Sequence, residues 1–325
     1  MSVYYSSHSP SFADHPTVTP SLVAHIPLSL RRRQKMYESL EELLKMHPCF
    51  NWKHFKDRSE SMFKWASESD DVGGASFGEG RSGSVATTPT TKADLARAIF
   101  FGTSSGPCAQ RAPAAQRPPI SFFAAASAAF ALGGLLDKSA DEQAESLRSD
   151  PVRNGKIISK DTASAPAVLF ALSQQALTVF ENSNTYDLDY LVAMILQVLY
   201  VLHEGKARLA HNLLPDVGKM VNVARTMGLD SDPDDFPGKF TLFEAELRRR
   251  VWWDIYYYDL FISDYMGRAP LINDHECSTR LPMDVDEELF NPSCGALPLP
   301  RTSQSALEPN ASDFKYFRLK CRYVF

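Results

Sequence analysis

A run of large apolar side chains between residues 246 and 262 constrains the fold of this chain more than any other feature. It places Trp252 beside Trp253, directly after an arginine triplet and before three consecutive tyrosines. Two adjacent indoles inside an apolar run require a helix that is buried on nearly every side. The sequence Gly-Arg-Ala-Pro at 267–270 then predicts a sharp, ordered turn.

Helical periodicity recurs along the rest of the chain. Apolar residues at 36, 40, 43 and 44 share one helical face. Helices are predicted at 30–46, 52–67, 92–101, 120–136, 165–181, 188–204, 207–227 and 241–266. Asp187 and Thr241 are predicted N-caps, and Gly205 and Gly228 are predicted helix ends. Because no window shows consecutive alternating, β-branched strands, we predict an all-α fold, a multi-helix bundle or solenoid-like domain.

Composition shifts divide the chain into segments. Residues 1–27 are rich in Ser, Pro and His and are expected to form an irregular lead-in. Mobile loops are expected at 70–91, 102–119 and 137–160. Residues 291–325 are expected to form a loop and the start of one more helical segment, so we expect the fold to be cut short there.

Charge and hydropathy exclude several classes of protein. The 325 residues are 44% hydrophobic and 22% charged, as in a globular protein of one large domain or two ordinary ones. The formal net charge is -5, whereas DNA-binding domains usually carry an excess of basic residues that bind the phosphates, so DNA contact by these residues is not expected. The uncharged segment 120–136 is at the short limit for a membrane span, but its alanine content favours a buried helix.

The sequence offers no metal or cofactor site. Its five cysteines (Cys49, Cys108, Cys277, Cys294 and Cys321) lie far apart, which suits reduced thiols and not structural zinc. Residues 78–83 match Gly-x-Gly-x-x-Gly, but no strand precedes them and no helix follows, so nucleotide binding is rejected. With no catalytic motif, no enzyme activity and no cofactor are predicted.

Four polar or aromatic groups admit two interpretations each. The aromatic run at 252–258 is interpreted as core and not as a base-stacking platform, which would have to face solvent. The triplet 248–250 is placed on a helix surface, with an ion pair from Arg250 to Asp254 four residues on. The triplet 31–33 stays open between an import or phosphate-binding signal and a helix surface, and the acidic cluster at 284–288 is expected to be solvated.

Several short motifs occur in an order that resembles the regulatory domain, or middle homology region, of the fungal zinc-cluster transcription factors. The resemblance extends over about residues 28–290. The motifs are an Arg-Arg-x-Trp-Trp signature, an acidic residue after it, a Gly-Arg-Pro turn and a Leu-Pro pair. The matching residues are Arg249, Arg250, Trp252, Trp253, Asp259, Gly267, Arg268, Pro270, Leu281 and Pro282. Departures occur at Leu260, where the family has Arg, and at Ala269, where it has Pro.

The resemblance implies an all-helical regulatory domain of a nuclear transcription factor that acts on RNA polymerase II genes. In that family a six-cysteine zinc cluster contacts DNA, and this chain lacks the cluster. Zinc and DNA are therefore expected only through a missing segment, while an effector or co-regulator protein is the expected partner of the domain itself. A homodimer is among the assemblies that the resemblance allows, and no membrane association is expected. The alternative is a helical protein-interaction or small-molecule-sensing module that does not itself bind DNA.

Overall fold

The computed structural model describes residues 18–26, 29–44, 47–73, 117–137, 165–183, 185–205, 207–287, 289–298, 317 and 320–321. Within these ranges the secondary structure is helical and contains no strand, which confirms the all-α prediction. The elements are α1 (Pro20–Val23), α2 (Leu30–Leu44), α3 (Trp52–Gly73), α5 (Ile120–Leu136), α7 (Pro166–Glu181), α8 (Leu188–Glu204), α9 (Ala207–Thr226), η2 (Pro233–Asp235), α10 (Leu242–Tyr265) and η3 (Asp274–Glu276).

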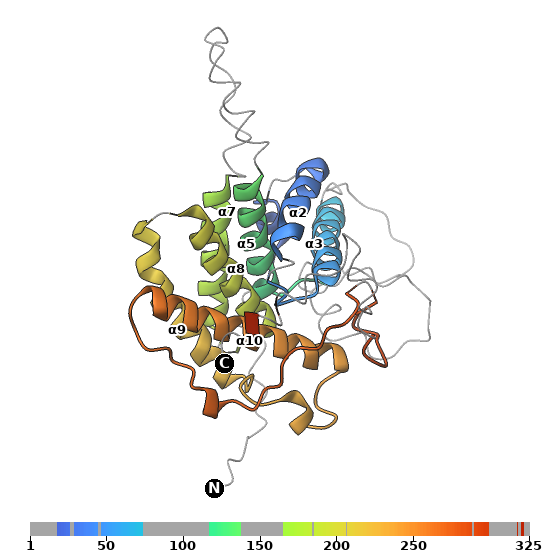
Figure 1. The fold of residues 1–325 in the computed structure, drawn as a ribbon. Helices are drawn as coiled ribbons and strands as arrows, with labels where there is room; N and C mark the ends of the chain where they lie inside the picture. Colours follow the sequence, from blue (N-terminus) through green and yellow to red (C-terminus); the bar gives the residue numbers. More distant parts are fainter. Residues whose placement is uncertain are drawn as a thin grey trace, which may run out of the picture.

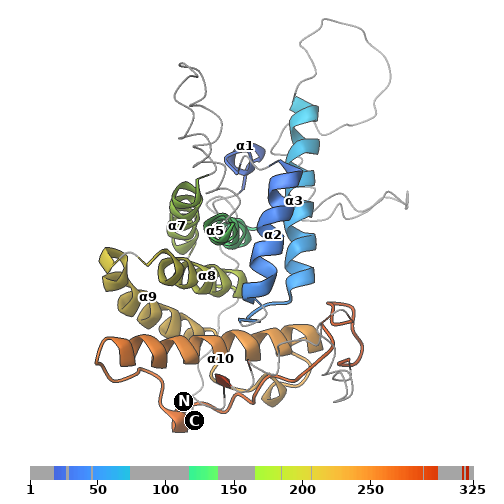
Figure 2. The same ribbon diagram turned by 45° about the horizontal axis from the view of Figure 1, so that its top comes forward.

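The helices form a bundle around α5. Helices α7, α8 and α2 pack against α5, and α3 lies beside α2 on the outside (Figure 1). Helix α9 packs on α8, and the long helix α10 runs across one end of the bundle, where it contacts α8 and α9 (Figure 2). The chain thus folds into a helical bundle closed at one end by α10.

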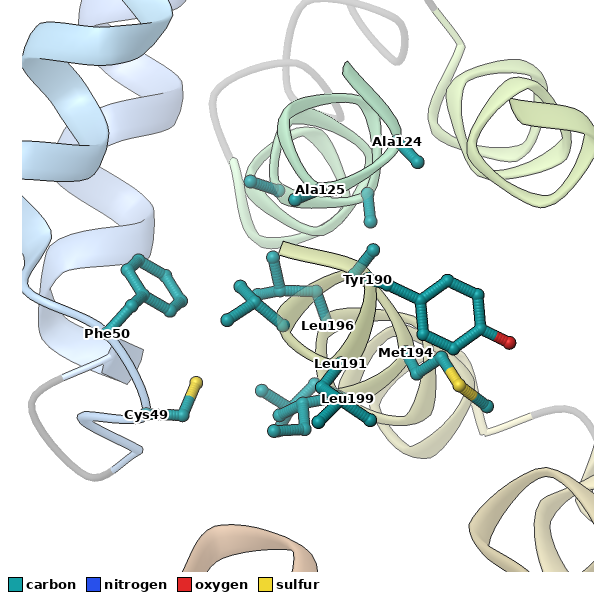
Figure 3. Packing of buried hydrophobic residues seen from close by; sticks show 14 of the residues in the cluster. Cys49, Phe50, Ala124, Ala125, Tyr190, Leu191, Met194, Leu196 and Leu199 are labelled. Atoms are coloured by element: carbon teal, nitrogen blue, oxygen red, sulfur yellow. The ribbon is translucent and has the colours of Figure 1, made fainter. Parts of the chain in front are cut away.

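Helix α5 is the alanine-rich segment, and every residue from Ile120 to Gly133 in it is buried. Its small side chains let neighbouring helices approach closely, and Figure 3 shows α5 lying directly beside α8. The buried-helix prediction for this segment is confirmed. Among the described residues, no helix combines the length and the apolarity that a membrane crossing needs.

The closest approach in the bundle lies at the end of α5. A Cβ atom on Gly133 would stand 2.9 Å from the backbone oxygen of Met36 in α2. Such a contact is shorter than van der Waals packing allows, so glycine is required for α2 to lie this close. The contact of α5 with α7 includes a buried hydrogen bond, in which the Ser173 hydroxyl of α7 donates to the backbone oxygen of Ala124 at 2.8 Å.

Most predicted helix ends are confirmed. The Asp187 carboxylate accepts from the backbone N–H of Tyr190 at 2.8 Å, and the Thr241 hydroxyl accepts from that of Glu244 at 3.1 Å. Gly205 and Gly228 adopt φ angles of 66° and 70°, the left-handed conformation that favours glycine after a helix.

Two predicted irregular segments contain helix. Helix α1 lies inside the lead-in at 1–27, because the Thr19 hydroxyl caps it and Pro20 occupies its first turn. Helix α3 continues to Gly73, past the predicted start of a loop at 70, since no Gly or Pro interrupts it earlier. The predicted helix 92–101 and the bodies of the loops at 70–91, 102–119 and 137–160 lie outside the described residues.

Candidate functional site

Helix α10 carries an unusual number of charged side chains into the core. Six of them are at most 7% exposed: Glu246, Arg248, Arg249, Arg250, Asp254 and Asp259. A buried charge is costly unless an opposite charge or hydrogen-bonding groups compensate it. The compensating groups come from several segments of the chain, so α10 joins parts that are distant in sequence.

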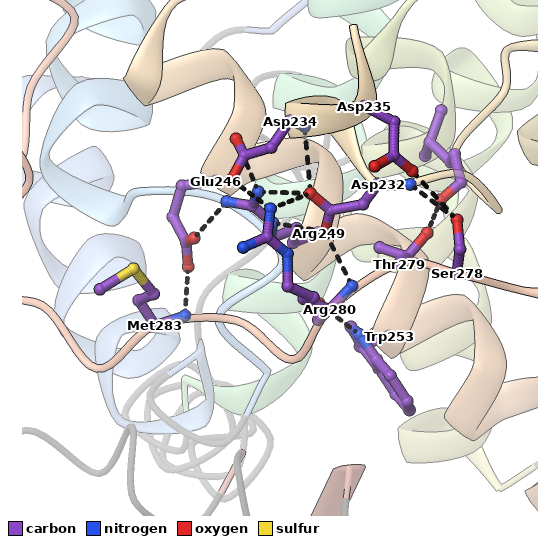
Figure 4. Close-up of polar contacts among 11 residues, drawn as sticks. Asp232, Asp234, Asp235, Glu246, Arg249, Trp253, Ser278, Thr279, Arg280 and Met283 are labelled. Atoms are coloured by element: carbon purple, nitrogen blue, oxygen red, sulfur yellow. Dashed lines mark hydrogen bonds and ion pairs between the residues drawn. The ribbon is translucent and has the colours of Figure 1, made fainter. Parts of the chain in front are cut away.

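Arg249 forms the first of these links (Figure 4). Its Nε and Nη2 atoms donate to the two carboxylate oxygens of Asp232, just before η2, at 3.0 and 2.7 Å. Arg280 also binds Asp232, through its backbone N–H at 2.8 Å and through its guanidinium at 2.9 Å. Burial alone would raise the pKa of Asp232, but the two arginines outweigh it and hold this pKa far below its ordinary value.

Arg250 forms a second link and corrects a prediction. It is fully buried, and its Nη2 lies 2.6 Å from Glu287 Oε1 while its Nε lies 3.5 Å from Glu246 Oε1. The predicted pair with Asp254 is wrong, as is the surface position of the triplet. Glu246 lies four residues before Arg250, just as Asp254 lies four residues after it, so the same spacing rule allows the pair with Glu246 equally well. The acidic cluster at 284–288 was expected to be solvated, but its residue Glu287 binds Arg250 and also accepts a hydrogen bond from Asn51 Nδ2 at 3.0 Å.

Two residues compensate the charge of Asp254: His47, which precedes α3, and Lys320, which lies beyond position 316. Asp254 Oδ1 lies 2.7 Å from the ammonium nitrogen of Lys320 and 3.7 Å from His47 Nδ1. Burial alone would raise the pKa of Asp254, but Lys320 and His47 outweigh it and lower the pKa to about 2. Asp254 therefore stays ionised inside the core.

Asp259 orders the turn that follows α10. Its Oδ2 accepts from the backbone N–H groups of Leu271 and Ile272 at 2.8 and 2.7 Å. The helix itself ends at Gly267, which has a φ of 63°. The backbone N–H of Gly267 donates to the backbone oxygen of Asp264, and that of Arg268 donates to the backbone oxygen of Ser263. The turn predicted at 267–270 is thus an ordered helix end, with Arg268 and Pro270 exposed.

Both indoles belong to the core. Trp252 and Trp253 are 0% and 1% exposed, so the predicted burial is confirmed and a base-stacking surface is excluded for them. Trp253 Nε1 donates to the backbone oxygen of Arg280 at 2.9 Å. Leu281 and Pro282 follow directly, the first half-buried and the second buried.

The residues that carry the family resemblance therefore form two contact groups. Trp253 donates to the backbone oxygen of Arg280, the residue before the Leu-Pro pair, and Arg249 binds the same Asp232 carboxylate as Arg280. Asp259 holds the chain just after the Gly-Arg-Ala-Pro turn. All of these contacts position backbone and side chains, and none presents a nucleophile or a general base to solvent.

One residue of the first arginine triplet is structural. Arg33 Nε and Nη2 donate to the carboxylate of Glu60 at 3.1 and 2.9 Å, and the guanidinium lies 4.2 Å from the ring centre of Phe63. Arg33 thus joins α2 to α3. Arg31 is exposed, and its role as an import or phosphate-binding signal stays a prediction.

A small cavity of about 40 Å³ lies between α3, α8 and α10. Cys49, His54, Arg58, Asp189 and Val251 are among its lining residues. A water molecule needs roughly 10–15 Å³ of such volume, whereas pockets for small organic ligands measure about 300–1,000 Å³. This cavity can hold a few water molecules, but an organic effector would require the helices to move apart.

The residues of this chain do not fit the family's zinc cluster. Among the described residues, no group of three or more His, Cys, Asp or Glu side chains is arranged to hold a metal ion. Cys49 and Cys321 are buried, and burial raises the pKa of the Cys49 thiol well above its ordinary value. A six-cysteine cluster also needs more cysteines than the five present.

Comparison with known proteins identifies the family of the chain. The sequence model of the fungal specific transcription factor domain matches residues 109–319, more than half of the chain. The chain belongs to this family. The description of the family and the names of the relatives are those of transcription factors and not of enzymes.

The relatives are fungal transcription factors that match over short stretches. The Zn(2)-C6 fungal-type transcription factor pigI of Monascus ruber is 37% identical over 87 residues, which is 27% of this chain and 11% of the relative. The C6 finger domain transcription factor hasF of Aspergillus fumigatus is 32% identical over 73 residues, 22% of this chain and 10% of the relative. The matched stretch thus spans about a tenth of these relatives' length. No solved structure matches the chain.

Proposed function

We propose that this chain is the regulatory part of a nuclear transcription factor that acts on RNA polymerase II genes. In this proposal, zinc and DNA contact belong to a six-cysteine segment outside the 325 residues. The helical domain restrains or licenses activation when an effector or co-regulator protein changes the packing of its helices. A homodimer of the domain is compatible with this role.

The observation that supports the proposal is that buried charges on α10 are paired with charges on other segments of the chain. These charges are compensated by Asp232 before η2, by Glu287 after α10, and by Lys320 beyond position 316. A partner that displaces one segment would leave a buried charge unpaired and so disturb α10. Packed cores respond to such a change by switching between discrete arrangements, which is what a regulatory element needs.

A tethering experiment tests the proposed role. Residues 1–325, fused to an unrelated bacterial DNA-binding domain, are expected to enter the nucleus and to change transcription of a reporter gene in a fungal cell. The DNA-binding domain alone and a fusion carrying Trp252→Asp, which disrupts the core, are the controls. Cytoplasmic retention together with an unchanged reporter would contradict the proposal.

The alternative is a protein-interaction or small-molecule-sensing module that never contacts DNA. Its support is the acidic net charge of -5, which does not favour phosphate binding. Both candidates predict that the purified chain shifts no duplex DNA at low salt. They differ for the complete gene product, since only a zinc-cluster factor would occupy promoters in chromatin immunoprecipitation.

A further inference from the structure

The outer face of α7 carries no charge. The helix lies at the edge of the bundle, where its inner face packs on α5 and α8 (Figure 2). Its exposed residues are Ala167, Val168, Ala171, Gln174, Gln175, Thr178 and Val179. From Pro166 to Phe180 the helix contains no ionisable side chain at all. Solvent therefore meets an uncharged helix face.

This composition is unusual for a helix at the surface of a bundle, which normally presents charged side chains to solvent. Helix α3 of the same bundle follows the normal pattern. Its exposed charged residues are Lys53, Lys56, Asp57, Lys64 and Glu68. On α7, two apolar side chains take such outward positions, since Val168 is 47% and Val179 40% exposed. Depletion of charge is typical of the centre of a protein interface.

The charge of the chain favours a second copy as the occupant of this face. Two copies carry a formal net charge of -5 each, so they repel one another over most of their surfaces. Two uncharged faces bring no like charges together, so this is where two copies meet with the least repulsion. A partner recognised by its charge would need ionised side chains on the outer face of α7, and the described face has none.

The side chains on α7 also complement themselves. Val168 and Val179 lie on the same flank of the exposed face, about three helical turns apart. In an antiparallel pair of α7 helices, related by a two-fold axis at the middle of the helix, each Val168 meets Val179 of the second copy. Between the two valine pairs, the small side chain of Ala171 lets the helices approach. The amide of Gln175 can both donate and accept hydrogen bonds there.

We propose that the outer face of α7 is the interface of a homodimer in which two α7 helices pack antiparallel. Stable dimers bury at least about 1,200 Å². A helix of 16 residues, roughly 24 Å long and 10 Å wide, supplies only part of that area, so the association is weak and depends on concentration. The interface is that of the homodimer with which the proposed function is compatible, but the association itself does not rest on that function.

Sedimentation velocity of the purified 325-residue chain provides the first test. The wild type is expected to shift from monomer toward dimer as its concentration rises. Val179→Glu buries an unpaired carboxylate in both valine pairs and should raise the dissociation constant at least about tenfold. Leu289→Glu is the matched control, because Leu289 is 62% exposed and lies outside α7. It should leave the association unchanged.

Two outcomes of this measurement would overturn the proposal. One is a wild type that stays monomeric up to about 100 μM, a concentration at which even a weak specific dimer is populated. The other is a dimer that Val179→Glu loosens no more than Leu289→Glu does, because the two copies would then meet through another face.

Charge pairing across the two-fold axis provides the second test. Val168→Lys alone should weaken the dimer, as Val179→Glu does. The double variant places the introduced lysine of each copy opposite the introduced glutamate of the other, so it should associate more tightly than either single variant. Failure of this rescue would contradict the antiparallel arrangement. Neither test involves transcription, so failure of the interface and failure of the regulatory role remain distinguishable.

Discussion

Asp232 and Arg249 form a two-pronged ion pair inside the protein, with both carboxylate oxygens within 3.0 Å of guanidinium nitrogens. The side chains are 3% and 6% exposed, so water compensates neither charge. The pair fixes the segment before η2 against α10, and Arg280 joins the same carboxylate. One carboxylate therefore holds together three segments of the chain.

Replacement of Asp232 by alanine should destabilise the protein strongly. Arg249 would stay buried without its main partner, and breaking such a pair costs about 3–5 kcal/mol. Urea unfolding followed by tryptophan fluorescence measures the loss. Asp235→Ala is the matched control, since Asp235 is exposed and should change stability by no more than about 0.5 kcal/mol. Similar losses for the two variants would contradict the role given to Asp232.

Neighbouring glycines at the end of α5 should respond differently to a methyl group. In Gly133→Ala the new Cβ meets the backbone oxygen of Met36, so overpacking should cost about 1–3 kcal/mol. In Gly134→Ala it meets the flexible end of the Met36 side chain at 3.0 Å, which can move aside. Thermal unfolding of both variants measures the difference. Greater damage from Gly134→Ala would show that α2 and α5 pack in another way.

The turn after α10 should require glycine for its backbone conformation. Gly267 has φ 63°, and an L-residue there is disfavoured by about 1–2 kcal/mol. Gly267→Ala should lower the free energy of unfolding by about that amount, although no atom would clash with the new Cβ. Gly295→Ala, which also meets nothing within 4 Å, should be nearly neutral. A neutral Gly267→Ala would rule out the left-handed helix end.

Asp254 should make stability depend on pH in the acid range. Its folded pKa is about 2, below the ordinary value of 3.8. A lowered carboxyl pKa contributes stability above the unfolded pKa, and this contribution is lost as pH falls from about 4 to 2. The shift corresponds to about 2 kcal/mol. The difference in unfolding free energy between wild type and Asp254→Asn should therefore shrink over this range. A difference that stays constant between pH 5 and 2 would contradict this account of Asp254.

The helix boundaries were predictable because their signals are local. Asp187 and Thr241 act as caps through their own backbone neighbours, and Gly228 ends α9 through its own conformation. The adjacent indoles also sufficed to predict that this part of α10 is buried. The short helix α1 was missed because proline and serine dominate the segment around it.

The partners of the buried charges could not be predicted in the same way. Asp232 lies 17 residues before Arg249, and Lys320 lies 66 residues after Asp254. No local spacing selects such partners, and the i,i+4 rule selected a wrong one for Arg250. One usable signal was present: a triplet of arginines in an apolar helix requires carboxylates, and the acid-rich segment at 230–235 is nearby in sequence.

Hydrogen–deuterium exchange measured by mass spectrometry tests the central claim, that α10 joins separate segments through its buried charges. In wild type, peptides covering 249–259 should exchange among the slowest. In Asp232→Asn, the account predicts faster exchange both at 229–236 and at 278–283, because Arg280 shares the same carboxylate. Faster exchange confined to 229–236, with 278–283 unchanged, would contradict it.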